Sequence, residues 1–215
     1  MRRMSVVVVL SALAIGSPLT AFFSGNAVAT PATTTVTHVR PVDASGHLLP
    51  GYKVTRRFGN ANCLFGSEAT GTAYRCFAGN FVIDPCWVTD DPAYVDCLSE
   101  GWSHSVARLH VTKGYDNSGY TRAGSRGKYP WDVEVVGGIR CGWLQGASGV
   151  VGKYRVDYGC GKTPKTVLIG GVDRSKPVWT IRKAHDTGNY HYKQDGRAKL
   201  AEAWYGKPSR KGSNS

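Results

Sequence analysis

The sequence has few acidic residues and lacks the short-spaced motifs that mark metal and phosphate sites. It contains 15 Asp and Glu residues against 27 Lys and Arg residues, which gives a formal net charge of +12 at pH 7. Paired Cys-x-x-Cys motifs are missing, which excludes the common zinc patterns. Calcium loops with alternating acidic ligands and Gly-rich phosphate loops are missing too. The sequence therefore indicates no metal and no cofactor.

A long apolar run occurs once, near the N-terminus. Two arginines precede an apolar stretch over residues 6–15, and the small residues Ala-Val-Ala follow at 27–29. This order is typical of a secretory signal peptide over residues 1–29. Gly, Ser and Pro at 16–18 interrupt the run and argue against a membrane-spanning anchor. We expect a secreted protein, extracellular or associated with the cell wall, with no transmembrane anchor after cleavage.

Positive charge is concentrated in the second half of the chain. Residues 30–113 hold seven Lys or Arg and seven Asp or Glu, whereas residues 114–215 hold eighteen and eight. This asymmetry favours an anionic partner, such as a cell-wall polymer, although solubility alone could explain it. The basic residues lie scattered among Gly and turn residues, without the dense run that indicates a specific nucleic-acid partner. Another extracellular protein is the second kind of partner that we consider.

Six cysteines in an exported chain indicate three structural disulfides. They are Cys63, Cys76, Cys86, Cys97, Cys141 and Cys160. A lone catalytic cysteine would leave an odd count, which is not seen. Pairing of sequence neighbours is favoured because each couple closes a short loop, and such a bridge stabilises a fold by about 3 kcal/mol. A crossed pairing of the first four cysteines is the alternative.

Short alternating runs between turn residues predict a mainly β fold. The stretch WDVEVV over 131–136 alternates apolar and acidic residues, and KYRVDYGC over 153–160 continues this pattern. Turn-forming residues at 173–176 separate two apolar runs and predict a hairpin, with Pro177 opening its second strand. We therefore expect a single disulfide-stapled domain over residues 51–206, built as a β-sheet or a sandwich-like arrangement.

The regions around this domain have other compositions. Residues 30–50 are rich in Thr, Pro and Ala, which predicts a flexible, extended lead-in. A Gly- and Ser-rich stretch over 117–130 predicts a mobile loop, and the basic tail over 207–215 is expected to be disordered. The segment 196–206, GRAKLAEAWYG, suits either a short C-terminal helix or a last strand.

Candidate catalytic residues are weak, and none is assigned. Ser148 lacks the spacing of a nucleophile elbow and is interpreted as a turn residue. His104 and His110 lie six residues apart in a strand-like stretch with Arg108, which would place all three on one face. With Glu100 they could serve a ribonuclease-like acid–base mechanism. His185 and His191 fit no metalloprotease spacing and are interpreted as loop residues.

Six tryptophans are the remaining candidates for a binding surface. They are Trp87, Trp102, Trp131, Trp143, Trp179 and Trp204. Several of them exposed on one face could stack on sugar rings. The sequence contains only six Phe residues, so the tryptophans are also needed to fill a core of this size. We expect them to be mainly core residues.

Four short elements, TAYRC, GNFVIDPC, VDC and AWYG, carry a resemblance that spans residues 63–205. In them the chain resembles uncharacterised secreted proteins of actinobacteria, in which an Ala-Tyr-Arg-Cys element precedes an Asp-Pro-Cys element. The resemblance implies an exported bacterial domain with disulfide bridges. It implies no activity and therefore identifies no catalytic residue.

Taken together, these patterns favour a secreted, non-catalytic binding module that acts at or near the bacterial surface. Its basic second half would face an anionic partner. A ribonuclease-like hydrolase that uses His104 or His110 is one alternative. The other is an extracellular inhibitor or interaction factor that displays the disulfide loop over residues 61–74.

Overall fold

The computed structural model describes residues 29–116, 129–145, 148–161, 165–188 and 191–207. The expected signal peptide up to residue 28, most of the expected loop over 117–130 and the expected tail from residue 208 lie outside the described residues. The described residues form strands, turns and bends but no helix. None of them therefore belongs to a helix long and apolar enough to cross a membrane.

The described residues form thirteen strands in chain order. They are β1 (Thr35–Val39), β2 (Lys53–Phe65), β3 (Tyr74–Ala78), β4 (Phe81–Val88), β5 (Tyr94–Leu98), β6 (Ser105–Asp116), β7 (Asp132–Val135), β8 (Ile139–Trp143), β9 (Val150–Val151), β10 (Tyr154–Cys160), β11 (Thr166–Asp173), β12 (Thr180–Gly188) and β13 (His191–Gly206). The expectation of a mainly β, disulfide-stapled fold is confirmed.

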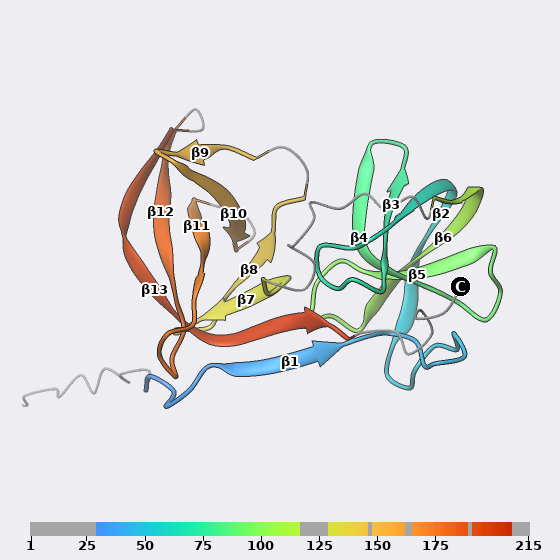
Figure 1. Cartoon of the computed structure of the whole chain (residues 1–215), viewed down its shortest axis with the longest axis horizontal. Coiled ribbons are helices and arrows are strands. Elements are labelled where there is room, and N and C mark those ends of the chain that lie inside the picture. Colours follow the sequence, from blue (N-terminus) through green and yellow to red (C-terminus); the bar gives the residue numbers. More distant parts are fainter. Residues whose placement is uncertain (1–28, 117–128, 146–147, 162–164, 189–190, 208–215) are drawn as a thin grey trace, which may run out of the picture.

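Strands β2 to β6 form a closed five-stranded barrel, which we call the first barrel. Consecutive strands pair antiparallel, and β6 returns beside β2 in parallel. The parallel closure follows from the odd number of strands in an up-and-down ring. Figure 1 shows this barrel in green and cyan on one side of the molecule.

Small side chains and two disulfides fill the first barrel. Its buried cluster contains Ala61, Cys63, Cys76, Ala78, Ile83, Cys86, Val95, Cys97, Ala107, Leu109 and Val111. Cys63 lies directly opposite Cys76 and forms a disulfide with it, as does Cys86 with Cys97. A barrel of few strands has a narrow interior, so half-cystines and alanines fit where larger side chains would not.

A second barrel forms from β7, β8, β10, β11, β12 and β13, and it closes because β13 pairs with both β12 and β7. β1 extends the sheet beside β13, and β9 pairs with β10. All six strands of the ring contribute to one buried cluster that includes Val133, Tyr158, Leu168, Ile181 and Leu200. The third disulfide, Cys141–Cys160, joins directly opposite residues of β8 and β10. The predicted neighbour pairing of the cysteines is therefore confirmed.

The two barrels pack together through a buried apolar cluster. Trp87 and Leu98 of the first barrel contribute to it with Trp131 from the segment before β7. A Cβ added at Gly101 would lie 2.5 Å from Trp204 Cβ, so only glycine fits where the β5–β6 turn meets β13. Figure 1 shows β1 and β13 running side by side from the second barrel toward the first. The β domain expected over residues 51–206 thus consists of two packed barrels.

Two expectations at the chain ends were resolved by strand pairing. The segment 196–206 is the second half of strand β13 and not a helix, because its backbone pairs with β7 on one side and β1 on the other. The lead-in over residues 30–50 was expected to be flexible. Its residues Thr35–Val39 instead form β1 in the sheet, and Val42 is buried between the barrels. The hairpin predicted around 173–176 is confirmed as β11 and β12, but its second strand begins at Thr180 and not at Pro177.

Candidate functional site

A cavity of about 260 Å³ lies where the two barrels meet. The first barrel contributes Glu68, Ala69 and Asp84 to its wall, and the second barrel and the segment before it contribute the aromatic and basic residues. A concave site between two packed units, with apolar walls and a few converging polar groups, is the usual form of a small-molecule site. We therefore treat this cavity as the candidate functional site.

Four aromatic side chains line the cavity: Tyr129, Trp131, Trp143 and Tyr154. The Tyr154 ring lies tightly against Gly170, where an added Cβ would come within 2.6 Å of the ring. Gly170 also has a φ of +73°, a conformation that side chains other than glycine rarely adopt. The local backbone of β11 is therefore shaped to accept the tyrosine that forms this wall.

Asp84 is the most buried acidic group of the cavity wall. Its carboxylate accepts hydrogen bonds from the Ser67 hydroxyl and from the backbone N–H of Glu68, and Arg75 Nη1 lies 3.9 Å away. These contacts favour the charged carboxylate, but burial outweighs them and raises the pKa of Asp84 to about 6. The pKa of Asp84 therefore lies about two units above the usual value of 3.8.

Asp157, Arg155 and Lys153 are the charged residues that the second barrel contributes to the cavity wall. The Asp157 carboxylate accepts a hydrogen bond from Gly171 N at 3.1 Å and lies 3.4 Å from Arg155 Nη1. Burial raises the pKa of Asp157. Arg155 also donates to the carbonyl of Leu144, and its guanidinium lies 5.1 Å from the centre of the Trp143 ring. Arg155, Asp157 and Trp143 thus place a cation, an anion and an aromatic face in one wall of the cavity.

A third buried carboxylate, Asp132, lies behind this wall at the contact between the barrels. It accepts hydrogen bonds from Gly101 N of the first barrel and from Trp143 N of the second. Asp132 is fully buried and has no basic partner among the described residues, and burial raises its pKa to about 7. Its carboxylate thus bridges the two barrels through backbone N–H groups alone.

Two polar atoms of the cavity-lining residues leave their hydrogen-bonding capacity unused. Trp143 Nε1 and Gln145 Oε1 are buried and have no partner in the part of the chain that the structure describes. The amide nitrogen of the same Gln145 donates to the Asp84 carbonyl across the barrel contact at 2.8 Å. Buried polar atoms in native proteins are nearly always hydrogen-bonded, so two unpaired atoms among the cavity-lining residues distinguish this region.

Most lysines of the second barrel are free of ion pairs. Of the seven described lysines beyond residue 129, only Lys183 lies within 4.0 Å of a carboxylate in the described residues, at 3.5 Å from Asp195. The other six are exposed: Lys153, Lys165, Lys176, Lys193, Lys199 and Lys207. Three arginines of the same barrel, by contrast, form ion pairs within it, namely Arg140, Arg155 and Arg197.

The histidines expected in loops lie in strands instead. His185 is in β12 and His191 opens β13, because the ladder between these strands extends to the pair Gly188 and His191. His185 lies 3.3 Å from the same Asp195 carboxylate that Lys183 approaches. Ser148, expected in a turn, lies outside any strand just before β9.

The residues of the ribonuclease alternative do not converge. His104 lies just before β6 and packs on Tyr52, whereas His110 lies within β6 and packs on Tyr94. His110 follows His104 by six positions of nearly extended chain, which corresponds to about 20 Å. Arg108 makes a two-pronged ion pair with the buried Asp96. One phosphate could not contact both histidines at that separation, so these residues form no acid–base pair.

The disulfide loop of the inhibitor alternative is not displayed. Within residues 61–74, Ser67, Ala69, Thr70 and Ala73 are all nearly inaccessible to solvent. The loop packs against the end of β13, where Gly206 N donates to Ala69 O. A segment buried between two barrels cannot insert into another protein's active site without their separation.

The tryptophans are core residues, as expected. Trp87, Trp131 and Trp204 are buried at 2–4% exposure, and the other three are half-buried. None of the six is among the exposed large apolar residues of the described chain. Trp131 and Trp143 nevertheless reach the cavity, so two core tryptophans also contribute to the candidate site.

Sequence reasoning missed the acidic residues of the site. From the sequence, no role in a site was assigned to Asp84, and Asp157 was placed in an alternating strand without such a role. The one signal in the sequence is that both occur beside strongly apolar or cysteine-containing strand residues.

For metal binding, the one Cys-rich group found in the described residues consists of Cys76, Cys86 and Cys97, whose sulfurs are all in disulfides.

Comparison with protein-family models, with curated proteins and with solved structures gave no match, so the interpretation depends on the residues of this chain.

Proposed function

We propose that the chain is an exported bacterial binding module that acts without catalysis at or near the cell surface. Its partner is anionic, such as a polymer of the cell wall. The three disulfides suit an extracellular or otherwise oxidising environment. The signal-peptide pattern and the resemblance to secreted actinobacterial proteins support the same proposal.

The observation that carries the proposal is the set of six exposed lysines without ion pairs on the second barrel. Lysine is a compact, strongly hydrated charge on a flexible stem, which suits contacts with many anionic groups in variable geometry. Three arginines of the same barrel, by contrast, form ion pairs with its own carboxylates. The lysines therefore supply a positive field that the protein itself does not neutralise.

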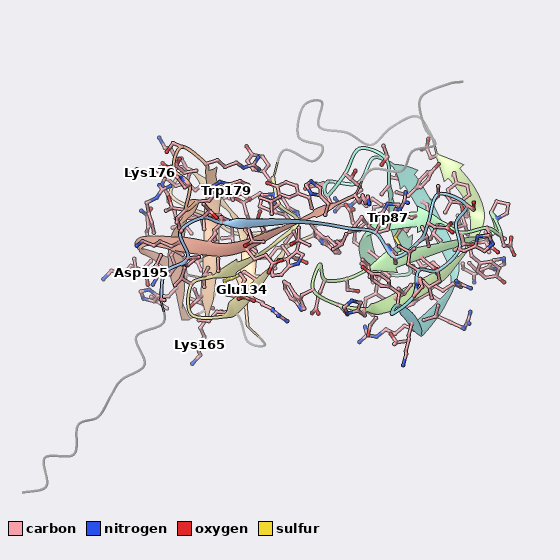
Figure 2. All side chains as sticks on the ribbon, turned by 90° about the horizontal axis from the view of Figure 1, so that it is seen from below. Trp87, Glu134, Lys165, Lys176, Trp179 and Asp195 are labelled. Atoms are coloured by element: carbon pink, nitrogen blue, oxygen red, sulfur yellow. A yellow bond between two sulfur atoms is a disulfide. The ribbon has the colours of Figure 1, made fainter. Side chains whose placement is uncertain are left out.

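The distribution of these lysines favours an extended partner over a small anion. Figure 2 shows Lys165 and Lys176 projecting from opposite sides of the second barrel. Lys193 and Lys199 lie on β13, a strand of this barrel. Charges spread in this way cannot converge on one phosphate, but they can contact a polymer or a charged matrix from several sides.

Retention on isolated cell wall tests this function. The oxidised protein, residues 30–215, would be incubated with purified actinobacterial cell wall over a series of salt concentrations, and soluble fragments would be measured in the same samples. We expect retention at low salt that weakens steeply as salt screens the charges, without release of fragments. Absent retention, retention that is insensitive to salt, or release of soluble fragments would contradict the proposal.

A further inference from the structure

We infer that the cavity between the barrels is a second binding site, which shares only Lys153 with the set of exposed lysines, and that it binds a neutral sugar in its pyranose form. The inference depends on the chemistry of the cavity wall and not on the proposed surface function. It combines three features of the site: aromatic walls, mixed polar groups and limited volume.

The aromatic walls suit the apolar faces of a sugar ring. Tyr129, Trp131, Trp143 and Tyr154 line one cavity, and Tyr154 is held in place by the close approach of Gly170. A pyranose presents C–H groups on its ring faces, which pack on aromatic side chains, while its hydroxyl groups point outward around the edge. Rigid aromatic side chains provide such contact area with little loss of conformational entropy.

The polar groups of the wall suit hydroxyl groups better than a charge. Glu68, Asp84 and Asp157 supply acceptors, and Lys153 and Arg155 supply donors. A hydroxyl group both donates and accepts, so one ring can satisfy carboxylates and a guanidinium together. The three carboxyl groups outnumber the two basic groups, which disfavours an anionic ligand, and a purely apolar ligand would bury all five groups without partners. Neutral, hydroxyl-rich ligands avoid both costs.

The volume limits the ligand to about one ring. Clefts for drug-sized ligands have volumes of about 300–1,000 Å³, whereas this cavity has about 260 Å³. A single sugar residue fits this space, either as a free monosaccharide or as one residue of a longer glycan. A free monosaccharide has few atoms, so we expect a dissociation constant of about a millimolar.

Nuclear magnetic resonance of the tryptophan indole N–H groups can locate the ligand. Glucose, galactose, mannose and N-acetylglucosamine would each be titrated into the ¹⁵N-labelled, oxidised chain. At least one sugar should produce saturable shifts at the Trp131 and Trp143 indoles. The Trp179 indole, on the second barrel but outside the cavity wall, should not move (Figure 2). Single Trp→Phe variants would assign the signals.

A pair of tyrosine variants separates the cavity from the rest of the surface. Tyr154→Ala removes one wall, and we expect sugar binding to weaken at least about fivefold, since a stacked aromatic contributes of the order of 1 kcal/mol. Tyr94→Ala, on the first barrel and outside the cavity wall, is the matched control and should bind as the unmodified chain does. Thermal unfolding would verify that both variants are folded, and Tyr154→Leu would replace Tyr154→Ala if needed.

Three outcomes would overturn the inference. One is the absence of saturable shifts with all four sugars. Another is shifts at Trp179 with the Trp131 and Trp143 signals unchanged. The third concerns glucuronate, titrated in the same way as an acidic control. If glucuronate alone binds, and if its binding disappears when Lys165, Lys193 and Lys199 are reversed in charge, the ligand belongs to the surface lysines and not to the cavity. None of these outcomes depends on retention by the cell wall, so the two proposals can fail separately.

Discussion

Asp132 is the residue whose chemistry depends most on the packing of the two barrels. Its carboxylate accepts backbone N–H groups from Gly101 and Trp143, which belong to different barrels, and is fully removed from solvent. Burial without a basic partner raises its pKa from 3.8 to about 7. The Asp132 carboxyl therefore binds its proton more tightly in the folded chain than in the unfolded chain.

The resulting pH dependence has a definite sign. Between pH 4 and 7 the folded state binds more protons at Asp132 than the unfolded state, so the contribution of Asp132 to the free energy of unfolding decreases as the pH rises. In Asp132→Asn this contribution is absent. Chemical denaturation at a series of pH values from 4 to 8 should therefore show a flatter stability profile for Asp132→Asn than for the unmodified chain.

An exposed acidic residue provides the control for this measurement. Asp195 lies on the surface of the second barrel beside Lys183 (Figure 2). Asp195→Asn should leave the decline of stability between pH 4 and 7 in place. Equal pH profiles for Asp132→Asn and the unmodified chain would contradict the assignment of a raised pKa to Asp132.

Individual residues of the candidate site were harder to predict from the sequence than the disulfides were. The cysteine pairs could be predicted because short loops favour local pairing, and their strands are adjacent in sequence. The burial of Asp84 could not, because it depends on Ser67 and Arg75, which the β2–β3 connection brings beside it, and on Gln145 of the other barrel. No local pattern specifies contacts across that distance.

Strands with alternating residues were predicted well, and strands that depend on distant partners were not. The alternating stretch in β7 and the apolar runs around the β11–β12 hairpin show their conformation in the sequence itself. β1 lacks a strong pattern and becomes a strand because β13 lies beside it, more than 160 residues later. The segment 196–206 likewise contains residues with high helix propensity but forms a strand, because it pairs with β7 and β1. Tertiary context here overrides helix propensity.

The disulfide of the second barrel joins strands β8 and β10. Cys141 and Cys160 are separated by 19 residues and lie directly opposite each other. Replacing both with Ala should lower the free energy of unfolding by about 3 kcal/mol, because the unfolded chain gains loop entropy. Chemical denaturation of the double variant measures this loss. An unchanged free energy of unfolding would show that the bridge does not constrain the unfolded chain.

At the scale of the whole molecule, the two barrels differ in their disulfides, their charge and their share of the cavity wall. The first barrel is narrow, is held by two internal disulfides and comes from a stretch of chain with balanced charge. The second barrel contributes most of the cavity wall and carries the lysines without ion pairs. This division was visible in the sequence as charge asymmetry, but the boundary between two barrels was not, because both halves show the same alternating pattern.

The most direct test of the central proposal is charge reversal on one barrel at a time. The variant Lys165→Glu/Lys193→Glu/Lys199→Glu changes three exposed lysines of the second barrel, and Lys53→Glu/Arg56→Glu/Lys113→Glu applies the same charge change to exposed residues of the first. Each lysine near an anionic surface contributes about 1 kcal/mol. Retention of the second-barrel variant on cell wall at low salt should therefore decrease more than tenfold, while that of the first-barrel variant changes far less. Equal losses in both variants, or no loss in either, would contradict a binding surface on the second barrel.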